Sequence, residues 1–315
     1  MQALTCDICG GKLKIGKGKI AVCDSCGMEH SFSRLQEKIQ EIKGTVHVDT
    51  AHLTDNYYSI ALDAYNADNF SVAETYCDKI LENTPNHTRA LLLKGKAVGW
   101  QSNLSHMRFK ESVICFANAV NCLYESEISA SELETEIEDE WKNLATALIK
   151  VRTDRFEKWL DIEETNGFYS DLDEMNSAIE IYERETSIKA NRNYIFSNVS
   201  SIVYNSISII SLTILLKYKL DGSKEAYQTF LNTTDNCVKI LEKTADLCDD
   251  DDSSDLKIYK LIVSMIQSVI DNNTTDYQGD RWGAYTEVPR LSKASENIKR
   301  EKIKSIQNKI KKINL

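Results

Sequence analysis

From Tyr57 onwards, apolar residues recur at steps of three and four, the spacing that gathers side chains on one face of an α-helix. The inward-facing positions of a first predicted pair of helices are Tyr57, Ile60, Ala61, Ala64, Ala73, Cys77 and Ile80. Pro85 follows this pair, and proline cannot continue a helix. Only one further proline, Pro289, occurs. So few helix breakers predict long helices and little sheet beyond the amino-terminal segment.

A second pair of helices is predicted from Thr88. Its inward-facing positions are Leu91, Gly95, Val98, Ser112, Phe116 and Ala119. The stretch 99–109 between its helices is about five residues longer than a repeat of 34 residues allows. It contains Trp100 and Phe109, which we expect to pack over the repeat; the alternative is a binding loop.

The two pairs resemble tetratricopeptide repeats, in which large and small residues alternate along two helices and a proline often follows. The resemblance covers Tyr57 to about Leu123, although Ala64 and Cys77 stand where the family usually has larger aromatics. It implies stacked helical hairpins that offer a groove to a protein segment. Some relatives clamp a terminal carboxylate with Lys and Asn, but this clamp is not expected here. Its positions hold Tyr58, Leu62, Leu92 and Lys96.

Further helices must stack on these pairs, because two repeats are too few to bury a continuous core. We predict them over 131–167, 170–190, 194–217, 224–247, 256–270 and 292–315. The apolar positions of the first are Leu133, Ile137, Trp141, Leu144, Leu148 and Trp159. Its carboxylates from Glu132 to Glu140 are expected to form a solvated face rather than a metal site, since consecutive residues point in different directions around a helix.

The predicted helix 194–217 has no charge between Arg192 and Lys217. A membrane span is therefore the alternative to a buried helix of the core. A polar stripe and an opposite apolar face favour the core helix. The stripe is Asn198, Ser201, Asn205 and Ser208, and the apolar face is Val199, Ile202, Ile209 and Leu216.

The longest irregular stretch is expected over 271–289, with Tyr277, Arg281, Trp282 and Tyr285. Such residues form interface anchors or a loop that packs against its own domain, and we favour the second interpretation. The tail 292–315 carries an isoleucine stripe among basic residues, so it can dock on an acidic surface, pair with another helix or contact phosphates. The stripe is Ile298, Ile303, Ile306, Ile310 and Ile313.

Near the amino terminus, Cys6 and Cys9 form one pair with two residues between them, and Cys23 and Cys26 form a second. Each spacing lets a tight turn aim two thiolates at one metal, so the four cysteines predict one closed, tetrahedral, structural zinc site. A redox pair, a disulfide and a chance arrangement are the competing interpretations. His30 could replace one cysteine as a ligand, but we expect it to be a surface residue on the last strand of the motif.

A β-hairpin is predicted between the cysteine pairs, with strands at 13–15 and 20–22 and a glycine-rich turn at 16–18. Gly27 is expected in the left-handed conformation. The segment Cys6 to Phe32 thus resembles a zinc ribbon, whose ligands correspond to Cys6, Cys9, Cys23 and Cys26. Zinc ribbons bind DNA, RNA or protein, or only cap a domain, so the resemblance does not identify a partner.

Composition supports a soluble protein of two or three units, with 315 residues of which 42% are apolar. Five cysteines remain beyond the proposed ligands: Cys77, Cys115, Cys122, Cys237 and Cys248. Because they are scattered through apolar helical patterns, we expect reduced, buried thiols. Met1 to Cys6 has neither the basic start nor the apolar run of a signal peptide. These features favour the cytoplasm.

The net charge of −10 is unevenly distributed. Residues 1–43 hold seven basic and five acidic residues, and residues 290–315 hold nine and two. Between them lie 22 basic and 41 acidic residues, a balance of −19. The acidic body repels nucleic acid, whereas both ends could attract it.

The fold class we predict is mostly α, with a small β zinc ribbon, repeat-like helical hairpins and a further helical domain. The predicted segments are a zinc ribbon at 1–32, a short helix and linker at 33–50, tetratricopeptide-like helices at 51–125, an α-helical domain at 126–289 and a basic helix at 290–315. The whole chain resembles bacterial proteins that join one zinc ribbon to such helices and an uncharacterised helical extension.

The resemblance implies a non-enzymatic cytoplasmic scaffold or adaptor that binds a protein partner. No nucleophile has a neighbouring base in a recognisable arrangement, and the histidines are dispersed, so no enzyme is predicted. The alternative is nucleic-acid binding by the lysines of the ribbon and the basic tail. Those ribbon lysines are Lys12, Lys14, Lys17 and Lys19. A membrane partner is not expected.

Overall fold

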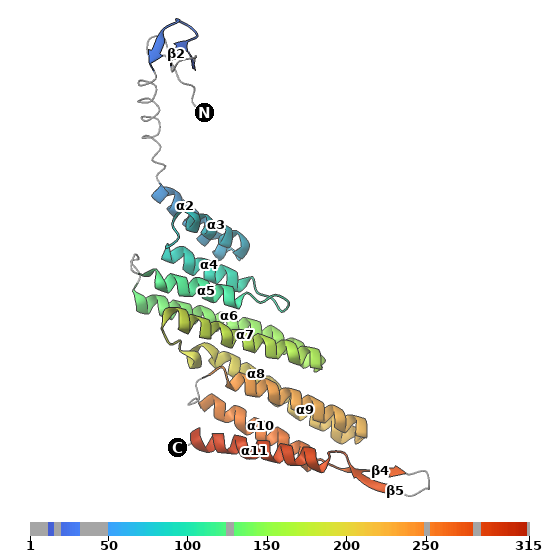
Figure 1. Ribbon diagram of the computed structural model, residues 1–315. Helices are drawn as coiled ribbons and strands as arrows, with labels where there is room; N and C mark the ends of the chain where they lie inside the picture. The colour runs from blue at the N-terminus through green and yellow to red at the C-terminus, as the bar shows by residue number, and fades with distance from the viewer. Residues whose placement is uncertain are drawn as a thin grey trace. The chain divides into compact units, whose positions relative to one another are not determined.

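The computed structural model describes residues 12–15, 20–31, 50–123, 129–248, 253–279 and 285–313. The chain divides into two compact units, Met1–Asn56 and Tyr57–Leu315 (Figure 1). The described residues are mostly helical, with a few short strands. Cys6, Cys9, the predicted turn at 16–18 and the predicted short helix within 33–50 lie outside the described residues.

The amino-terminal unit contains an antiparallel sheet of β1 (Leu13–Ile15), β2 (Ile20–Cys23) and β3 (Glu29–Ser31). Leu13 lies opposite Cys23, so β1 and β2 form the predicted hairpin. A tight turn then joins β2 to β3, in which the Gly27 N–H donates to the Cys23 carbonyl over 2.9 Å. Gly27 has a φ of 72° and therefore adopts the left-handed conformation expected for it.

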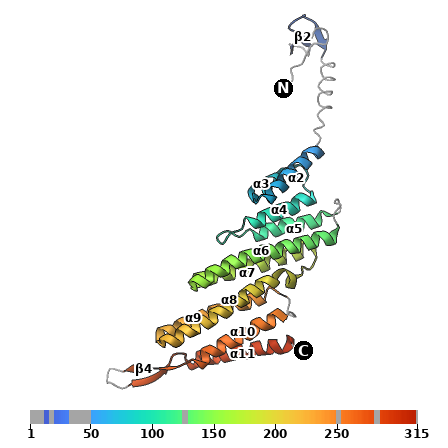
Figure 2. The same ribbon diagram turned by 180° about the vertical axis from the view of Figure 1, so that it is seen from behind.

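The second unit is a stack of helices that follow one another in chain order (Figure 1). They are α2 (Thr50–Asn66), α3 (Phe70–Asn83), α4 (Thr88–Trp100), α5 (Phe109–Asn121), α6 (Ala130–Trp159), α7 (Ile162–Thr186), α8 (Arg192–Asp221), α9 (Lys224–Ala245), α10 (Ser253–Asp271) and α11 (Lys293–Ile313). The stack has two layers, because α6 lies against α8 while α5 lies against α7 and α7 against α9. The same order is seen from behind (Figure 2).

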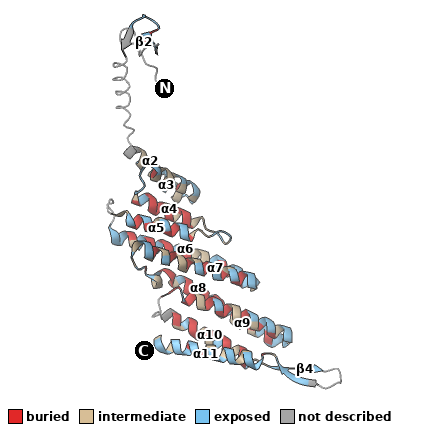
Figure 3. Ribbon diagram, in the orientation of Figure 1, coloured by how far each residue is buried: buried red, intermediate tan, exposed pale blue. Residues whose placement is uncertain are grey.

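The core lies between the two layers, where buried residues are concentrated (Figure 3). In the α4–α5 hairpin all six predicted inward positions are buried. A Cβ on Gly95 would lie 2.5 Å from the Phe116 ring, so only glycine permits this approach of α4 to α5. In the α2–α3 hairpin the prediction is wrong for Ile60, which is 41% exposed, although Ala61 and Cys77 are fully buried.

The predicted helix 131–167 is in fact two helices, and the predicted start at Ser170 is wrong. Leu160 has a φ of 50°, which ends α6 in the left-handed conformation. Asp161 then caps α7 by accepting a hydrogen bond from the Glu164 N–H over 2.8 Å. Gly167 therefore lies inside α7, and Trp159, predicted to be apolar core, is 58% exposed at the turn.

The stretch 271–289 also differs from the prediction, because it forms a β-hairpin. Strands β4 (Thr275–Gly279) and β5 (Tyr285–Pro289) pair antiparallel, with Thr275 opposite Pro289. Arg290 holds the base of the hairpin through its Nε, which donates to the Asp276 carboxylate over 2.9 Å. The strands are largely exposed, with Tyr277 at 70%, and Arg281 and Trp282 lie outside the described residues.

The basic carboxyl-terminal helix α11 docks on the acidic body, one of the three arrangements predicted for it. Ile303 and Ile306 are buried against the core. Lys299 forms an ion pair with Asp235 of α9, and Lys302 pairs with Glu242 over 2.9 Å. The predicted isoleucine stripe is wrong for Ile298, which is 66% exposed.

Candidate partner-binding surface on α4, α6 and α8

An exposed stripe runs along the whole of α8 and changes character halfway. Its first four positions, at steps of three and four, are Tyr194, Asn198, Ser201 and Asn205. Its last four continue the same spacing and are Ile209, Leu212, Leu216 and Leu220, with exposed fractions of 64, 63, 60 and 88%. Single exposed apolar residues are ordinary, but an aligned row of four is a candidate interaction surface.

This stripe corrects the prediction for α8. Val199 is buried as expected, but Ile209 and Leu216 lie on the same face as Asn205, not on the opposite face. The reason is the helical repeat of 3.6 residues, which places Ile209 one turn after Asn205. By length and composition α8 is apolar enough to cross a membrane. In the helical unit, ten of its residues are buried among neighbouring helices.

The neighbouring helix α6 shows a similar change. The first half of α6 and Lys96 of α4 line a groove of about 430 Å³. The carboxylates in this groove are Glu132, Glu136, Asp139 and Glu140. Lys96 pairs with Glu136 over 2.5 Å, which leaves an excess of negative charge in the groove. Tyr194 of α8 donates its hydroxyl to Asp139 over 2.5 Å, so the polar part of α8 adjoins this groove.

Glu140 departs from the predicted solvated acidic face. Its side chain is buried and accepts hydrogen bonds from Trp100 Nε1 over 2.6 Å and from the Tyr65 hydroxyl over 3.2 Å. Burial and the adjacent Glu140 carboxylate raise the pKa of Tyr65, which keeps the hydroxyl protonated as a donor. Glu140 therefore orients Trp100, as well as contributing charge.

Past Glu140, the same side of α6 becomes apolar. Trp100, Leu104, Leu144, Leu148 and Val151 line a pocket of about 320 Å³ between α6 and the stretch that connects α4 to α5. Val151 is 54% exposed at its rim. Trp100 is stacked on Phe70 with 6.2 Å between ring centroids, and Phe109 is fully buried. The expectation that both aromatics pack over the repeat is thus confirmed, yet the stretch between them also forms a pocket wall.

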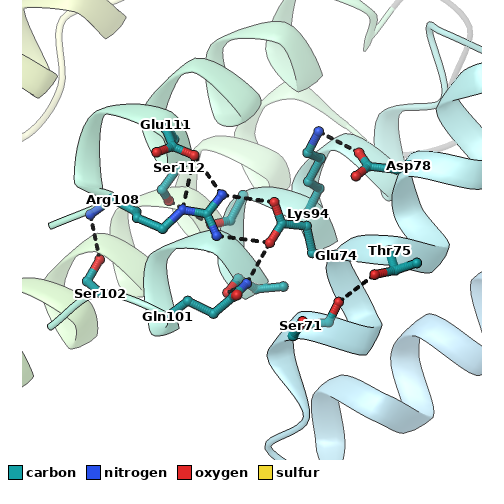
Figure 4. A network of polar contacts seen from close by, with 12 residues as sticks. Ser71, Glu74, Thr75, Asp78, Lys94, Gln101, Ser102, Arg108, Glu111 and Ser112 are labelled. Atoms are coloured by element: carbon teal, nitrogen blue, oxygen red, sulfur yellow. Dashed lines mark hydrogen bonds and ion pairs between the residues drawn. The ribbon is translucent and has the colours of Figure 1, made fainter. Parts of the chain in front are cut away.

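This connecting stretch is held at its base by Arg108 (Figure 4). The guanidinium donates to both oxygens of Glu74 on α3 over 2.9 Å, and Gln101 donates to the same carboxylate over 2.7 Å. The hydrogen bonds from Arg108 hold the pKa of Glu74 below its usual range. The Arg108 N–H also donates to the Ser102 hydroxyl over 3.0 Å. The pocket wall is therefore fixed before any partner binds.

A buried arginine secures the other side of the wall. Arg152 of α6 donates to Asp171 over 2.6 Å, to Glu164 over 3.3 Å and to the Leu104 carbonyl over 3.3 Å. Burial raises the pKa of Asp171 even though the pair with Arg152 opposes this shift. A Cβ on Gly167 would lie 2.6 Å from the Arg152 guanidinium, so glycine makes room for the network.

The structure places two of the four predicted zinc ligands at one turn: Cys23 is the last residue of β2, and Cys26 lies on the turn that follows. Cys23 is buried, and the Ser25 N–H donates to its sulfur over 3.4 Å. Backbone N–H groups that point at sulfur stabilise a thiolate, so the turn suits a metal ligand. Among the described residues, no group of three or more His, Cys, Asp or Glu side chains is arranged to hold a metal. Cys6 and Cys9 lie outside these residues.

Three of the five remaining cysteines fit the expectation of buried thiols. Cys77, Cys237 and Cys248 are buried, while Cys115 and Cys122 are half-buried. Burial raises the pKa of Cys77 to about 12 and that of Cys115 to about 11. Thiols with such values are poor nucleophiles and are inert structural residues.

Comparison with known proteins found no protein family and no curated protein that matches this chain.

Proposed function

We propose that the chain is a non-enzymatic cytoplasmic scaffold or adaptor that binds a protein segment on α4, α6 and α8. The observation that carries this proposal is the row from Ile209 to Leu220, four aliphatic side chains each at least 60% exposed. Leaving such a row in water is unfavourable by about 25 cal/mol for each Å² of apolar surface. A partner that covers it gains this free energy.

The layered stack of helical hairpins supports a tetratricopeptide-like arrangement for this scaffold. Gly95 and Ser112 occupy the close contact of α4 with α5, and the Ser112 hydroxyl donates to the Gly95 carbonyl over 2.7 Å. In such arrays, each hairpin contacts its neighbours and extended binding surfaces arise along the stack. The buried thiols of Cys77 and Cys237 suit a reducing compartment.

A structural zinc ion held by Cys6, Cys9, Cys23 and Cys26 would stabilise the amino-terminal unit. Four thiolates make a closed site that leaves no position for substrate, so the metal would contribute folding free energy rather than catalysis. Metal analysis of the purified chain should find about one zinc per chain. Replacing Cys6 and Cys23 by serine should remove the zinc, and a metal content unchanged by both replacements would reject this set of ligands.

Nucleic-acid binding by the ribbon and the basic tail is the competing function. The ion pairs of Lys299 and Lys302 with carboxylates of α9 neutralise part of the positive charge of α11. In the amino-terminal sheet, Lys14 forms an ion pair with Asp24 over 3.0 Å. These three ion pairs favour the scaffold. Binding of DNA or RNA at low salt that weakens steeply as salt rises would instead support the competing function.

The test of the scaffold is partner retention by the full chain from its native cell. The wild type should retain a protein that Leu212→Ser combined with Leu216→Ser does not. Ile298→Ser is the matched control, because Ile298 is exposed to the same degree on α11. Retention that the double substitution leaves unchanged, or that Ile298→Ser removes equally, would contradict the proposal.

A further inference from the structure

The candidate surface on α6 and α8 changes from polar to apolar along the length of the two helices. On α6, Glu136 and Asp139 lie in the acidic groove, whereas Leu148 and Val151 line the apolar pocket. On α8 the exposed stripe is polar as far as Asn205 and apolar beyond it. These two helices run side by side in the same direction, as both views of the ribbon show (Figures 1 and 2). Both apolar parts therefore lie toward the carboxyl ends of the helices.

Two hydrogen bonds fix how the polar parts meet. The Asn191 N–H donates to Glu138 over 2.8 Å, and the Tyr194 hydroxyl donates to Asp139 over 2.5 Å. Lys142 lies over the Tyr194 ring, 3.8 Å from its centroid. The beginning of α8 is thus attached to the acidic part of α6, and both helices become apolar as they extend beyond this contact.

The two parts of the surface differ in the chemistry that complements them. The groove holds four carboxylates against the single ammonium of Lys96, and the ion pair of Lys96 with Glu136 does not neutralise the other three. Basic side chains are the complement of such a groove. The apolar pocket takes a large hydrophobic side chain, and its wall is already fixed by Arg108 and Arg152.

The distance from the acidic groove to the apolar pocket along α6 suits a short helix. Glu136 and Val151 are fifteen residues apart along α6. At a rise of 1.5 Å per residue this is about 22 Å, the length of a helix of about four turns. Amphipathic helices bind grooves of this kind through apolar anchors repeated at three- and four-residue steps.

We propose, on the basis of the scaffold function above, that the partner presents an amphipathic helix. Its basic end occupies the acidic groove of α4 and α6, and its apolar face covers the pocket beside Trp100. The charge at one end selects the orientation of the helix, while the apolar contacts supply most of the affinity.

The test uses two synthetic helix-forming peptides of sixteen residues. Both carry leucines on one face; the first ends in four lysines and the second in four glutamates. Binding to the full chain is measured by calorimetry at two salt concentrations. The lysine peptide should bind at least about tenfold more tightly, corresponding to about 1.4 kcal/mol, and this preference should shrink at higher salt.

Variants of the chain then show which part of the surface binds the charged end of the peptide and which part binds its leucines. Glu136→Gln with Asp139→Asn should remove the preference for lysine but leave leucine-dependent binding. Val151→Glu should weaken both peptides. Glu301→Gln on α11 is the control, because it removes an exposed carboxylate outside the groove and should change nothing.

Equal affinity for the two peptides, or a preference that the groove variants leave intact, would overturn this inference. The scaffold would still stand if the native partner were retained in a manner that depends on Leu212 and Leu216. If neither peptide bound but the chain bound lipid vesicles through the same two leucines, the inference would fail and a membrane would be the occupant instead.

Discussion

The helices α8 and α11 each carry a row of aliphatic residues, but one row is exposed and the other is largely buried. On α11, Ile303 and Ile306 are buried, and lysines beside them form ion pairs with α9. On α8, Leu212 and Leu216 belong to a row that stays in solvent. An apolar stripe in the sequence thus identifies a helix face that tends to be buried. Only the tertiary structure shows whether other helices of the same chain bury it.

The largest effect should follow from placing a charge on the covered face. Ile306→Asp would place a carboxylate at a position that is only 4% exposed in the apolar core, which should lower the free energy of unfolding by about 3 kcal/mol or more. Urea unfolding of both proteins measures this difference. A loss below about 1 kcal/mol, the size expected for a surface substitution, would show that α11 is not an integral part of the stack.

Removing the Arg108–Glu74 ion pair beside the apolar pocket should have the second largest effect. Arg108→Ala leaves the Glu74 carboxylate, only 20% exposed, without its main partner, and should cost about 1–3 kcal/mol. The matched control is Arg184→Ala, which removes an ion pair whose arginine is 68% exposed and should cost about 0–1 kcal/mol. Equal losses for the two variants would mean that the Arg108–Glu74 pair does not fix the pocket wall.

The same carboxylate predicts a pH dependence. Because hydrogen bonds from Arg108 lower the pKa of Glu74 in the folded state, its ionised form stabilises the protein above the ordinary Glu pKa of about 4.3. That stabilisation is lost as the pH falls through the folded value. The difference in unfolding free energy between wild type and Glu74→Gln should therefore be largest near neutral pH and shrink below about pH 4. A difference that grows on acidification would have the wrong sign.

The smallest effect on stability should come from a substitution in the exposed row Ile209–Leu220 of α8. Leu216→Ser replaces a residue that is 60% exposed, so the free energy of unfolding should change by no more than about 0.5 kcal/mol. Thermal unfolding of the isolated chain measures this change. A loss comparable to that of Ile306→Asp would show that the row on α8 is covered within the molecule and is not a binding surface.

The parts that the sequence predicted well are those where local spacing and tertiary contacts agree. Gly95 and Phe116 were placed on inner faces because a small residue opposite a large one indicates close helices, and they do touch. The boundary at Leu160 was missed, although Asp161 and Glu164 carry a capping signal. Gly167 was taken as a helix end, because its actual role, making room for Arg152, depends on a contact between α6 and α7.

The candidate surface could be found from the sequence only in part. The polar stripe up to Asn205 was recognised, and extending its register by one turn would have reached Ile209. The solvated acidic face was anticipated, but the burial of Glu140 was not, since it requires Trp100 and Tyr65 to arrive from other helices. Continued further, the same register on α8 includes Leu212, which is exposed, and leaves out Ile210, which is buried.

Hydrogen exchange of the full chain, alone and with its retained partner, tests most directly whether the uncovered face is the binding surface. Amide exchange should slow in 209–220 of α8 and in 144–151 of α6, and remain unchanged in 293–313 of α11. Slowing confined to α11 or to the amino-terminal sheet, with no change in α6 and α8, would contradict the account.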